Sequence, residues 1–141
     1  MRISVIIPPH TPSCRIETAV LSSDCQRRAP DEVIVVGDCS TEREADMLAQ
    51  RVGGATVRFI SERTGSTGTA RSAGIAEAKG EAVAFLERDD FWYPEYLDAT
   101  LAILEKEPNA AAVATCYSDE PFGLAKSTYG RIGASETAWR G

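Results

Sequence analysis

The sequence predicts an α/β fold, a three-layer α/β/α sandwich built around a mainly parallel sheet. Short apolar runs without a helical period alternate along the chain with segments whose apolar residues recur at helical spacing. The apolar runs also lack the alternation of a half-exposed strand, as expected for strands that helices cover on both faces. Such an alternation of strands and helices is typical of parallel strands joined by right-handed crossovers.

Each run is predicted to be a strand, and the strands at 3–7 and 32–36 are predicted to be buried. The segments between the runs are predicted to be helices. The predicted strands cover residues 3–7, 32–36, 56–60, 82–86 and 110–115. The predicted helices cover residues 14–28, 42–51, 69–78 and 94–107. Gly80 stands just past the third helix, where a left-handed C-cap is expected.

The composition excludes several classes of protein. With 43% hydrophobic and 26% charged residues, the chain resembles an ordinary soluble domain. The net charge of −6 argues against nucleic acid or an anionic membrane as a partner. No stretch approaches the roughly 20 apolar residues of a membrane span. The four cysteines form no CxxC pair, and with one histidine they match no zinc pattern. Reduced thiols and a cytoplasmic location are therefore expected.

Polar clusters follow three of the predicted strands, at residues 8–11, 37–40 and 87–90. In an open parallel sheet the ligand crevice lies beyond the carboxyl ends of the strands. Each cluster by itself can be explained as a solvated turn. Together, at three strand ends, they favour a shared binding site.

The third cluster carries three carboxylates, on Glu87, Asp89 and Asp90. Carboxylates packed this closely repel one another unless a cation neutralises them. Mg²⁺ or Mn²⁺ fits this requirement, because these ions take oxygen ligands and bridge to substrate phosphates. Asp90 has a competing use as the cap of the helix near Pro94. A cap accounts for one carboxylate and leaves its neighbours unexplained.

Four segments together resemble the N-terminal portion of family 2 glycosyltransferases, which have the Rossmann-like GT-A fold. They are ISVIIP at 3–8, EVIVVGDCST at 32–41, GTARSAGIAEAKGE at 68–81 and AVAFLERDDFWYPEYL at 82–97. Tyr117-Ser118-Asp119 is similar to a segment that often follows the fifth strand. The resemblance implies a nucleotide-sugar-binding domain over residues 1–119. Residues 120–141 then form a poorly specified tail, the start of a missing or degenerate acceptor half.

The resemblance implies roles for several residues that would bind the nucleotide. Asp38 matches an aspartate that hydrogen-bonds the base, and Arg71 matches an arginine that approaches the base or the diphosphate. Arg71 is expected in the first turn of its helix, where the helix N-terminus favours anions. Pro8 and His10 stand where the end of strand one contacts the base.

The resemblance also implies the metal site. Asp89 occupies the position of the metal-contacting aspartate, with Asp90 and Glu87 as its neighbours. Arg88 replaces a small residue of the family pattern. Since a cation beside a metal site weakens metal binding, Arg88 is expected to turn away or to contact phosphate.

The implied reaction is transfer of a sugar from a nucleoside-diphosphate sugar, a UDP-sugar, with inversion, to the hydroxyl of a carbohydrate or other acceptor. The divalent metal would stabilise the leaving diphosphate. The general base is expected in the acceptor half, so no catalytic residue is assigned.

A second hypothesis is a non-catalytic nucleotide-sugar-binding or interaction module, which the departures at Gly37, Cys39 and Arg88 favour. A nucleotidyltransferase is a third, but residues 8–13 lack the basic residues expected for it. If an acceptor half is absent, apolar surface near Phe122, Tyr129 and Trp139 is expected to support self-association or a partner domain.

Overall fold

The computed structural model describes residues 1–8, 16–37, 39–61, 66–107 and 109–115. The chain divides into two compact units, Met1–Leu97 and Asp98–Gly141. The strands are β1 (Ile3–Ile7), β2 (Glu32–Gly37), β3 (Thr56–Ser61) and β4 (Ala82–Phe85). The helices are α1 (Glu17–Asp24), α2 (Cys39–Ala49), α3 (Thr67–Glu77) and α4 (Tyr96–Lys106).

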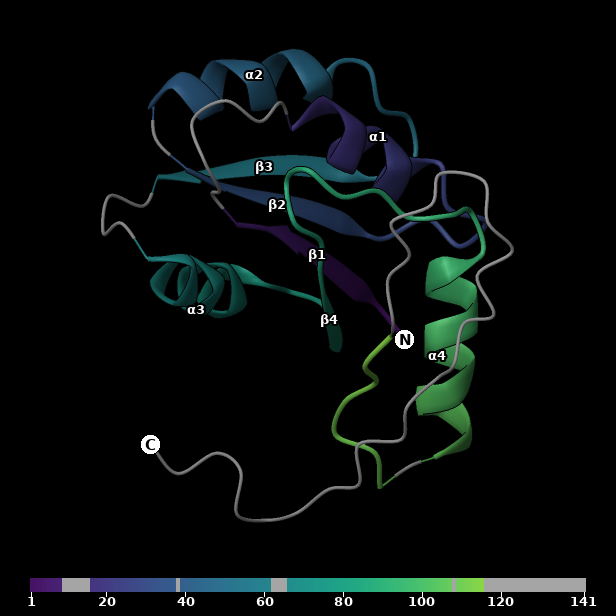
Figure 1. The fold of residues 1–141 in the computed structure, drawn as a ribbon. Coiled ribbons are helices and arrows are strands. Elements are labelled where there is room, and N and C mark those ends of the chain that lie inside the picture. Colours follow the sequence, from purple (N-terminus) through teal and green to yellow (C-terminus); the bar gives the residue numbers. More distant parts are fainter. Residues whose placement is uncertain (9–15, 38, 62–65, 108, 116–141) are drawn as a thin grey trace. The chain divides into compact units, whose positions relative to one another are not determined.

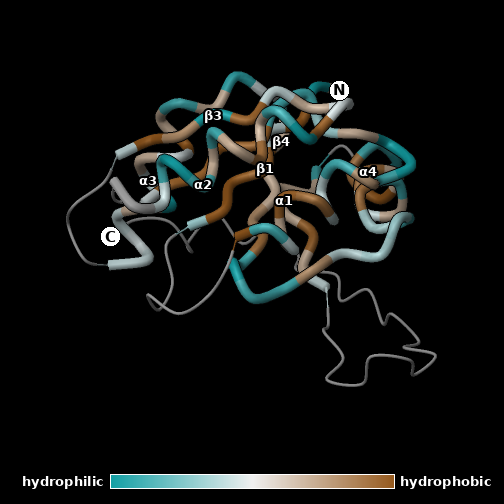
Figure 2. The backbone as a smooth tube through the Cα atoms, turned by 90° about the horizontal axis from the view of Figure 1, so that it is seen from above, coloured by the Kyte–Doolittle hydropathy of each residue, from teal (hydrophilic) through white to brown (hydrophobic). Residues whose placement is uncertain are grey.

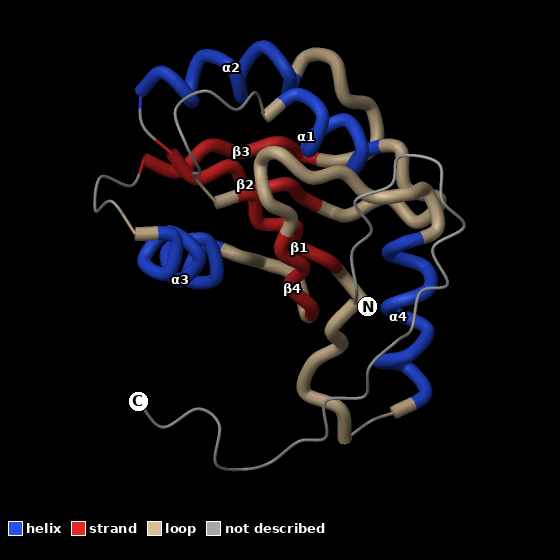
Figure 3. Tube along the Cα trace, viewed as in Figure 1, coloured by secondary structure: helices blue, strands red, loops and turns tan. Residues whose placement is uncertain are grey.

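The four strands form one parallel sheet in the order β3-β2-β1-β4 (Figure 3). Ile6 pairs with Ile34 of β2 on one side and with Phe85 of β4 on the other. The chain therefore proceeds outward from β1 to β3 and then crosses back to place β4 beside β1. This reversal is the switch point at which open α/β sheets bind ligands.

Helices cover both faces of the sheet, as the sequence predicts. Helices α1 and α2 lie on one face, and α3 lies on the opposite face (Figure 1). Right-handed crossovers produce this arrangement, because the chain moves in opposite directions across the sheet before and after β3. The three-layer α/β class is confirmed for the unit that contains the sheet.

The core follows the two central strands. Every residue of β1 and β2 is buried, and β1 is mostly hydrophobic in Figure 2. Ile6, Ile34 and Val36 pack with Ala70 of α3. Gly74 lets α3 approach closely, since a Cβ built there would lie 2.6 Å from Ile6 Cγ2. Both faces of the central strands are thus covered, which explains why their sequences lack alternation.

The amino ends of the strands are joined by a buried network around Glu32. Its carboxylate accepts hydrogen bonds from Ser4 Oγ at 2.6 Å, from the backbone N–H of Lys79 at 2.7 Å, and from Arg58 Nε and Nη2 at 3.0 and 2.8 Å. Burial would raise the pKa of Glu32, but the hydrogen bonds and the charge of Arg58 outweigh it and lower that pKa. The network holds together the amino ends of the strands, at the end of the sheet opposite to the polar clusters.

Two details of the predicted fold are wrong. Residues 110–115 form no strand, and only Ala114 makes an isolated bridge. Three of these residues are consecutive alanines, which favour strands weakly and bury little area. Gly80 is no left-handed cap, because α3 ends at Ala78 in an extended conformation. Gly80 is needed for close approach instead: its N–H donates to Ser4 Oγ at 2.8 Å, and a Cβ would lie 2.6 Å from Ser4 N.

Two further expectations remain predictions. The boundary at 119–120 and the aromatic residues Phe122, Tyr129 and Trp139 lie outside the described residues. Within the described part of the chain, no helix combines the length and the apolar character that crossing a membrane requires.

Candidate functional site

The carboxyl ends of β1 and β4 bring the acidic run to the switch point of the sheet. Leu86 N–H donates to Ile6 O at 3.0 Å, so pairing with β1 continues one residue past β4. Glu87 then leaves the sheet, and the turn is closed by a hydrogen bond from Asp90 N–H to Glu87 O at 3.2 Å. The turn therefore begins directly beside the end of β1.

Helix α3 carries Arg71 to the same turn. The helix is capped by Ser66, whose Oγ accepts from the N–H of Thr69 at 3.1 Å. The sequence predicts Arg71 in the first turn of this helix. Because the helix begins at Thr67, Arg71 lies in the second turn instead. Its guanidinium forms an ion pair with Glu87.

The guanidinium of Arg71 is held on two sides. One Nη donates to the Glu87 carboxylate, and Cζ lies 5.7 Å from the centroid of the Phe85 ring. Its Nε is buried and has no hydrogen-bond partner among the described residues. The sequence contains no signal for the contact with Phe85, since only the pairing of β4 and α3 in space creates it. Because 43% of the Arg71 side chain is exposed, the guanidinium is held in place and still presents N–H groups that suit an anion.

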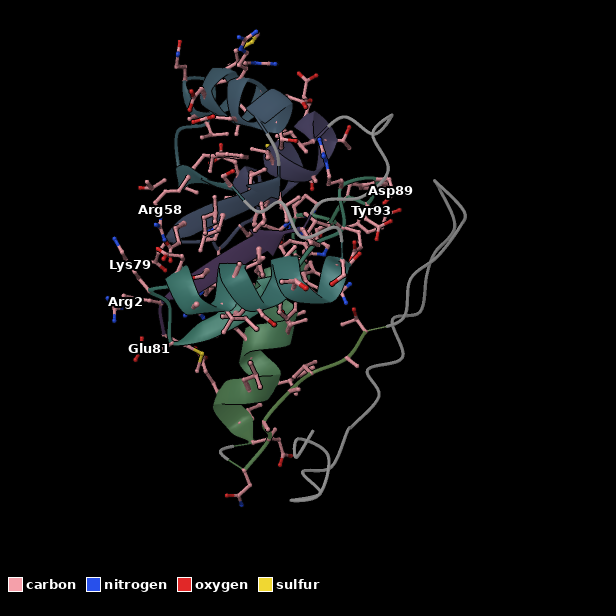
Figure 4. All side chains as sticks on the ribbon, turned by 90° about the vertical axis from the view of Figure 1, so that its left-hand side faces the viewer. Arg2, Arg58, Lys79, Glu81, Asp89 and Tyr93 are labelled. Carbon is pink, nitrogen blue, oxygen red and sulfur yellow. The ribbon has the colours of Figure 1, made fainter. Side chains whose placement is uncertain are left out.

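Asp89 and Asp90 are both exposed on the turn. Figure 4 shows Asp89 and Tyr93 at one end of the unit, and Arg2, Arg58, Lys79 and Glu81 at the other. The helix after the turn begins only at Tyr96, so Asp90 does not serve as its cap. The competing explanation for Asp90 is therefore wrong, and its carboxylate stays at the carboxyl end of the sheet.

Arg88 turns away from the acidic side chains into the protein. Its side chain is 8% exposed, and its two terminal nitrogens lie 3.5 Å from Thr41 Oγ1 and 3.5 Å from Glu44 Oε2 on α2. Glu44 also accepts the N–H of Ile16, just before α1, at 3.2 Å. The Nε of Arg88 is buried, and in the part of the chain that the structure describes it has no hydrogen-bond partner. The sequence gives no signal for the contacts of Thr41 and Glu44, because nothing near Thr41 indicates a partner 47 residues away.

The structure leaves the base end of the predicted site undescribed. Pro8 is buried directly after β1, but His10 and Asp38 lie outside the described residues. The structure thus brings Arg71 and Glu87 together and places Asp89, Asp90 and Arg88 on the adjoining turn. The nucleotide-binding roles of Pro8, His10 and Asp38 stay predictions.

The residues on the turn can hold a divalent ion only together with ligands from a bound phosphate. Mg²⁺ in phosphate sites is held by one or two carboxylates together with substrate phosphates. Asp89 has an exposed carboxylate on the turn, with Asp90 next to it, and the carboxylate of Glu87 is paired with Arg71. Among the described residues no three metal-ligating side chains gather in one place. A metal here therefore depends on phosphate oxygens for part of its coordination.

Comparison with known proteins identifies the family. The model of the family described as Glycosyl transferase family 2 matches residues 4–135. The chain belongs to this family. An uncharacterised glycosyltransferase of Nostoc sp. (strain PCC 7120) is 33% identical over 107 residues, which are 74% of this chain and 33% of that protein. The putative teichuronic acid biosynthesis glycosyltransferase TuaG of Bacillus subtilis (strain 168) is 34% identical over 122 residues, which are 82% of this chain and 46% of that protein.

Solved structures agree with the family in fold. TarS of S. aureus, residues 1–349 in complex with UDP-GlcNAc, matches with a TM-score of 0.65 and 27% identity. The match covers 80% of this chain and 33% of that one. The corresponding complex with UDP matches with a TM-score of 0.62. The chain thus has the GT-A fold and spans between a third and a half of the length of these relatives.

Proposed function

We propose that this chain is the donor-binding part of a glycosyltransferase that takes a nucleoside-diphosphate sugar, a UDP-sugar. The observation that carries the proposal is Arg71, which Glu87 and Phe85 hold at the switch point with 43% of its side chain exposed. The chain is acidic, with a net charge of −6, so an anionic donor needs a local cation of this kind. The solved relative that carries UDP-GlcNAc supports the choice of donor.

The proposed orientation of the donor follows from the elements around the site. The diphosphate lies between Arg71 and the turn that carries Asp89, and the base extends toward the ends of β1 and β2, where Pro8, His10 and Asp38 stand in the sequence. Asp89, with Asp90 beside it, would hold Mg²⁺ or Mn²⁺ together with the diphosphate oxygens. The ion would supply charge stabilisation of the departing diphosphate.

The proposed reaction is direct displacement at the anomeric carbon by an acceptor hydroxyl, with inversion. Displacement by the acceptor requires a general base within hydrogen-bond reach of that hydroxyl. No described residue is assigned to this role. The part of the reaction that falls to the described residues is to bind the diphosphate and to hold Asp89 in place.

Calorimetric titration with UDP tests the proposal. In the presence of Mn²⁺ the chain is expected to bind UDP, and Asp89→Asn is expected to weaken this binding by at least about tenfold. Asp46→Asn, an exposed aspartate on α2, is the matched control and is expected to bind like the unaltered chain. Equal UDP affinity with Mn²⁺ and with EDTA would contradict the proposal that Asp89 and a metal ion bind the diphosphate.

A further inference from the structure

The side chain of Arg88 is an unusual feature of the site, because it is a buried cation with poor compensation. Its contacts to Thr41 and Glu44 are both 3.5 Å long, and no described residue accepts a hydrogen bond from its Nε. Burying a charge raises the free energy of the folded state, and contacts of this length offset little of that increase. Stability of the fold alone therefore does not explain why an arginine lies here.

The contacts of Arg88 join two strand ends. The residue belongs to the turn after β4, directly before Asp89, while Thr41 and Glu44 belong to the first turns of α2. In the sequence, Asp38 stands between the end of β2 and the start of α2. Arg88 thus links the segment that carries Asp89 to the helix that follows Asp38.

The side chain at residue 37 determines whether Thr41 can lie where it contacts Arg88. Gly37 is the last residue of β2, and a Cβ built on it would lie 2.8 Å from three side-chain atoms of Thr41. One of these atoms is Cβ of Thr41, which the helix backbone holds in place, so α2 would have to shift. A shift of that turn would disturb the contacts of Thr41 and Glu44 with Arg88.

We infer that Arg88 is a positioning residue that connects the start of α2 to the acidic turn. Gly37 makes this connection possible, because the absence of a Cβ at residue 37 leaves room for Thr41. Arg88 acts on the donor through Asp89 and does not itself bind phosphate. The effect on donor binding rests on the proposed function, whereas the coupling between residues 37 and 88 does not.

The coupling is tested by thermal unfolding of Gly37→Ala, Arg88→Met and the double variant of the full chain. Gly37→Ala is expected to lower Tm by roughly 5 °C or more. In the Arg88→Met background the same change is expected to cost clearly less, because the contacts that the shift breaks are already gone. Additive shifts in Tm would overturn the coupling, whether or not the chain binds UDP.

The positioning role is tested by UDP titration in Mn²⁺ with Glu44, which Arg88 connects to the turn. Glu44→Ala is expected to weaken UDP binding about tenfold, as loss of a supporting contact commonly does. Glu42→Ala, an exposed residue on the same helix, is the control and is expected to leave binding unchanged.

If Arg88 were itself a phosphate ligand, Glu44→Ala would free its guanidinium. UDP affinity equal to or higher than that of the unaltered chain would therefore overturn the positioning role. Absence of UDP binding by the unaltered chain would contradict the proposed function instead, and the Tm comparison would still decide the coupling.

Discussion

Arg71 and Glu87 form the ion pair that joins α3 to the turn after β4. The pair is only partly exposed, and it places a guanidinium and a carboxylate at the point where the sheet order reverses. Glu87 is one of three carboxylates that the sequence offers as metal ligands. In the folded chain its carboxylate holds Arg71, so we expect it to act through that residue.

The first prediction concerns this pair. Glu87→Gln is expected to weaken UDP binding about tenfold, because Arg71 loses the charged partner that orients it. The midpoint for Mn²⁺ in a metal titration at saturating UDP is expected to change little. Calorimetry with UDP and with Mn²⁺ separates the two effects.

The control for Glu87 is Glu95→Gln, which removes the carboxylate of an exposed pair with Arg27. Exposed ion pairs contribute little to the stability of a fold, so this variant is expected to bind UDP with the affinity of the unaltered chain. A large loss of Mn²⁺ affinity in Glu87→Gln, with UDP binding intact, would make Glu87 a metal ligand after all.

The second prediction concerns Glu32 and pH. The folded chain lowers the pKa of Glu32, so its contribution to stability is present above the ordinary pKa of a glutamate and is lost as pH falls through the folded value. Glu32→Gln is expected to cost about 2–4 kcal/mol of unfolding free energy at pH 7, since Arg58 loses its buried partner.

The difference between Glu32→Gln and the unaltered chain should shrink as pH falls from 7 toward 3. Urea unfolding across this range measures it. Glu42→Gln, at an exposed position, is the control and is expected to stay within about 0.5 kcal/mol. A difference that is constant with pH would mean that Glu32 is not held in its charged form.

The third prediction concerns the contact between α3 and β1. Gly74→Ala is expected to destabilise the chain by about 1–3 kcal/mol, because the new Cβ would overlap Ile6. Gly53→Ala is the matched control, since no atom lies within 4 Å of a Cβ at that position. Chemical unfolding of the two variants should therefore differ clearly. Equal stability would mean that α3 does not pack against Ile6 as described.

The order of strands and helices could be predicted because the signals are local. Residues 3–7 and 32–36 are continuous apolar runs, and both lie in fully buried strands. The run at 110–115 also reads as apolar, but alanine side chains bury too little area to favour a strand. Periodicity thus identified the strands with branched side chains and failed for the one built on alanine.

The contacts within the site could not be predicted in the same way. The sequence places Arg71, Glu87 and Arg88 near strand ends, but their partners depend on which elements become neighbours. Arg71 meets Glu87 because α3 returns alongside β4, and Arg88 meets Thr41 because glycine at position 37 leaves room. The buried partner of Glu32 is likewise supplied by β1, through a serine inside an apolar run.

The central claim is that a nucleotide binds at the carboxyl ends of the strands, between Arg71 and the acidic turn. Hydrogen–deuterium exchange of the full chain with UDP and Mn²⁺ tests it most directly, because the method locates protection along the sequence. Slower exchange is predicted for residues 66–72 and 86–91, with no change for residues 79–82 at the opposite edge. Protection confined to residues 79–82, or none anywhere at saturating UDP, would contradict the claim.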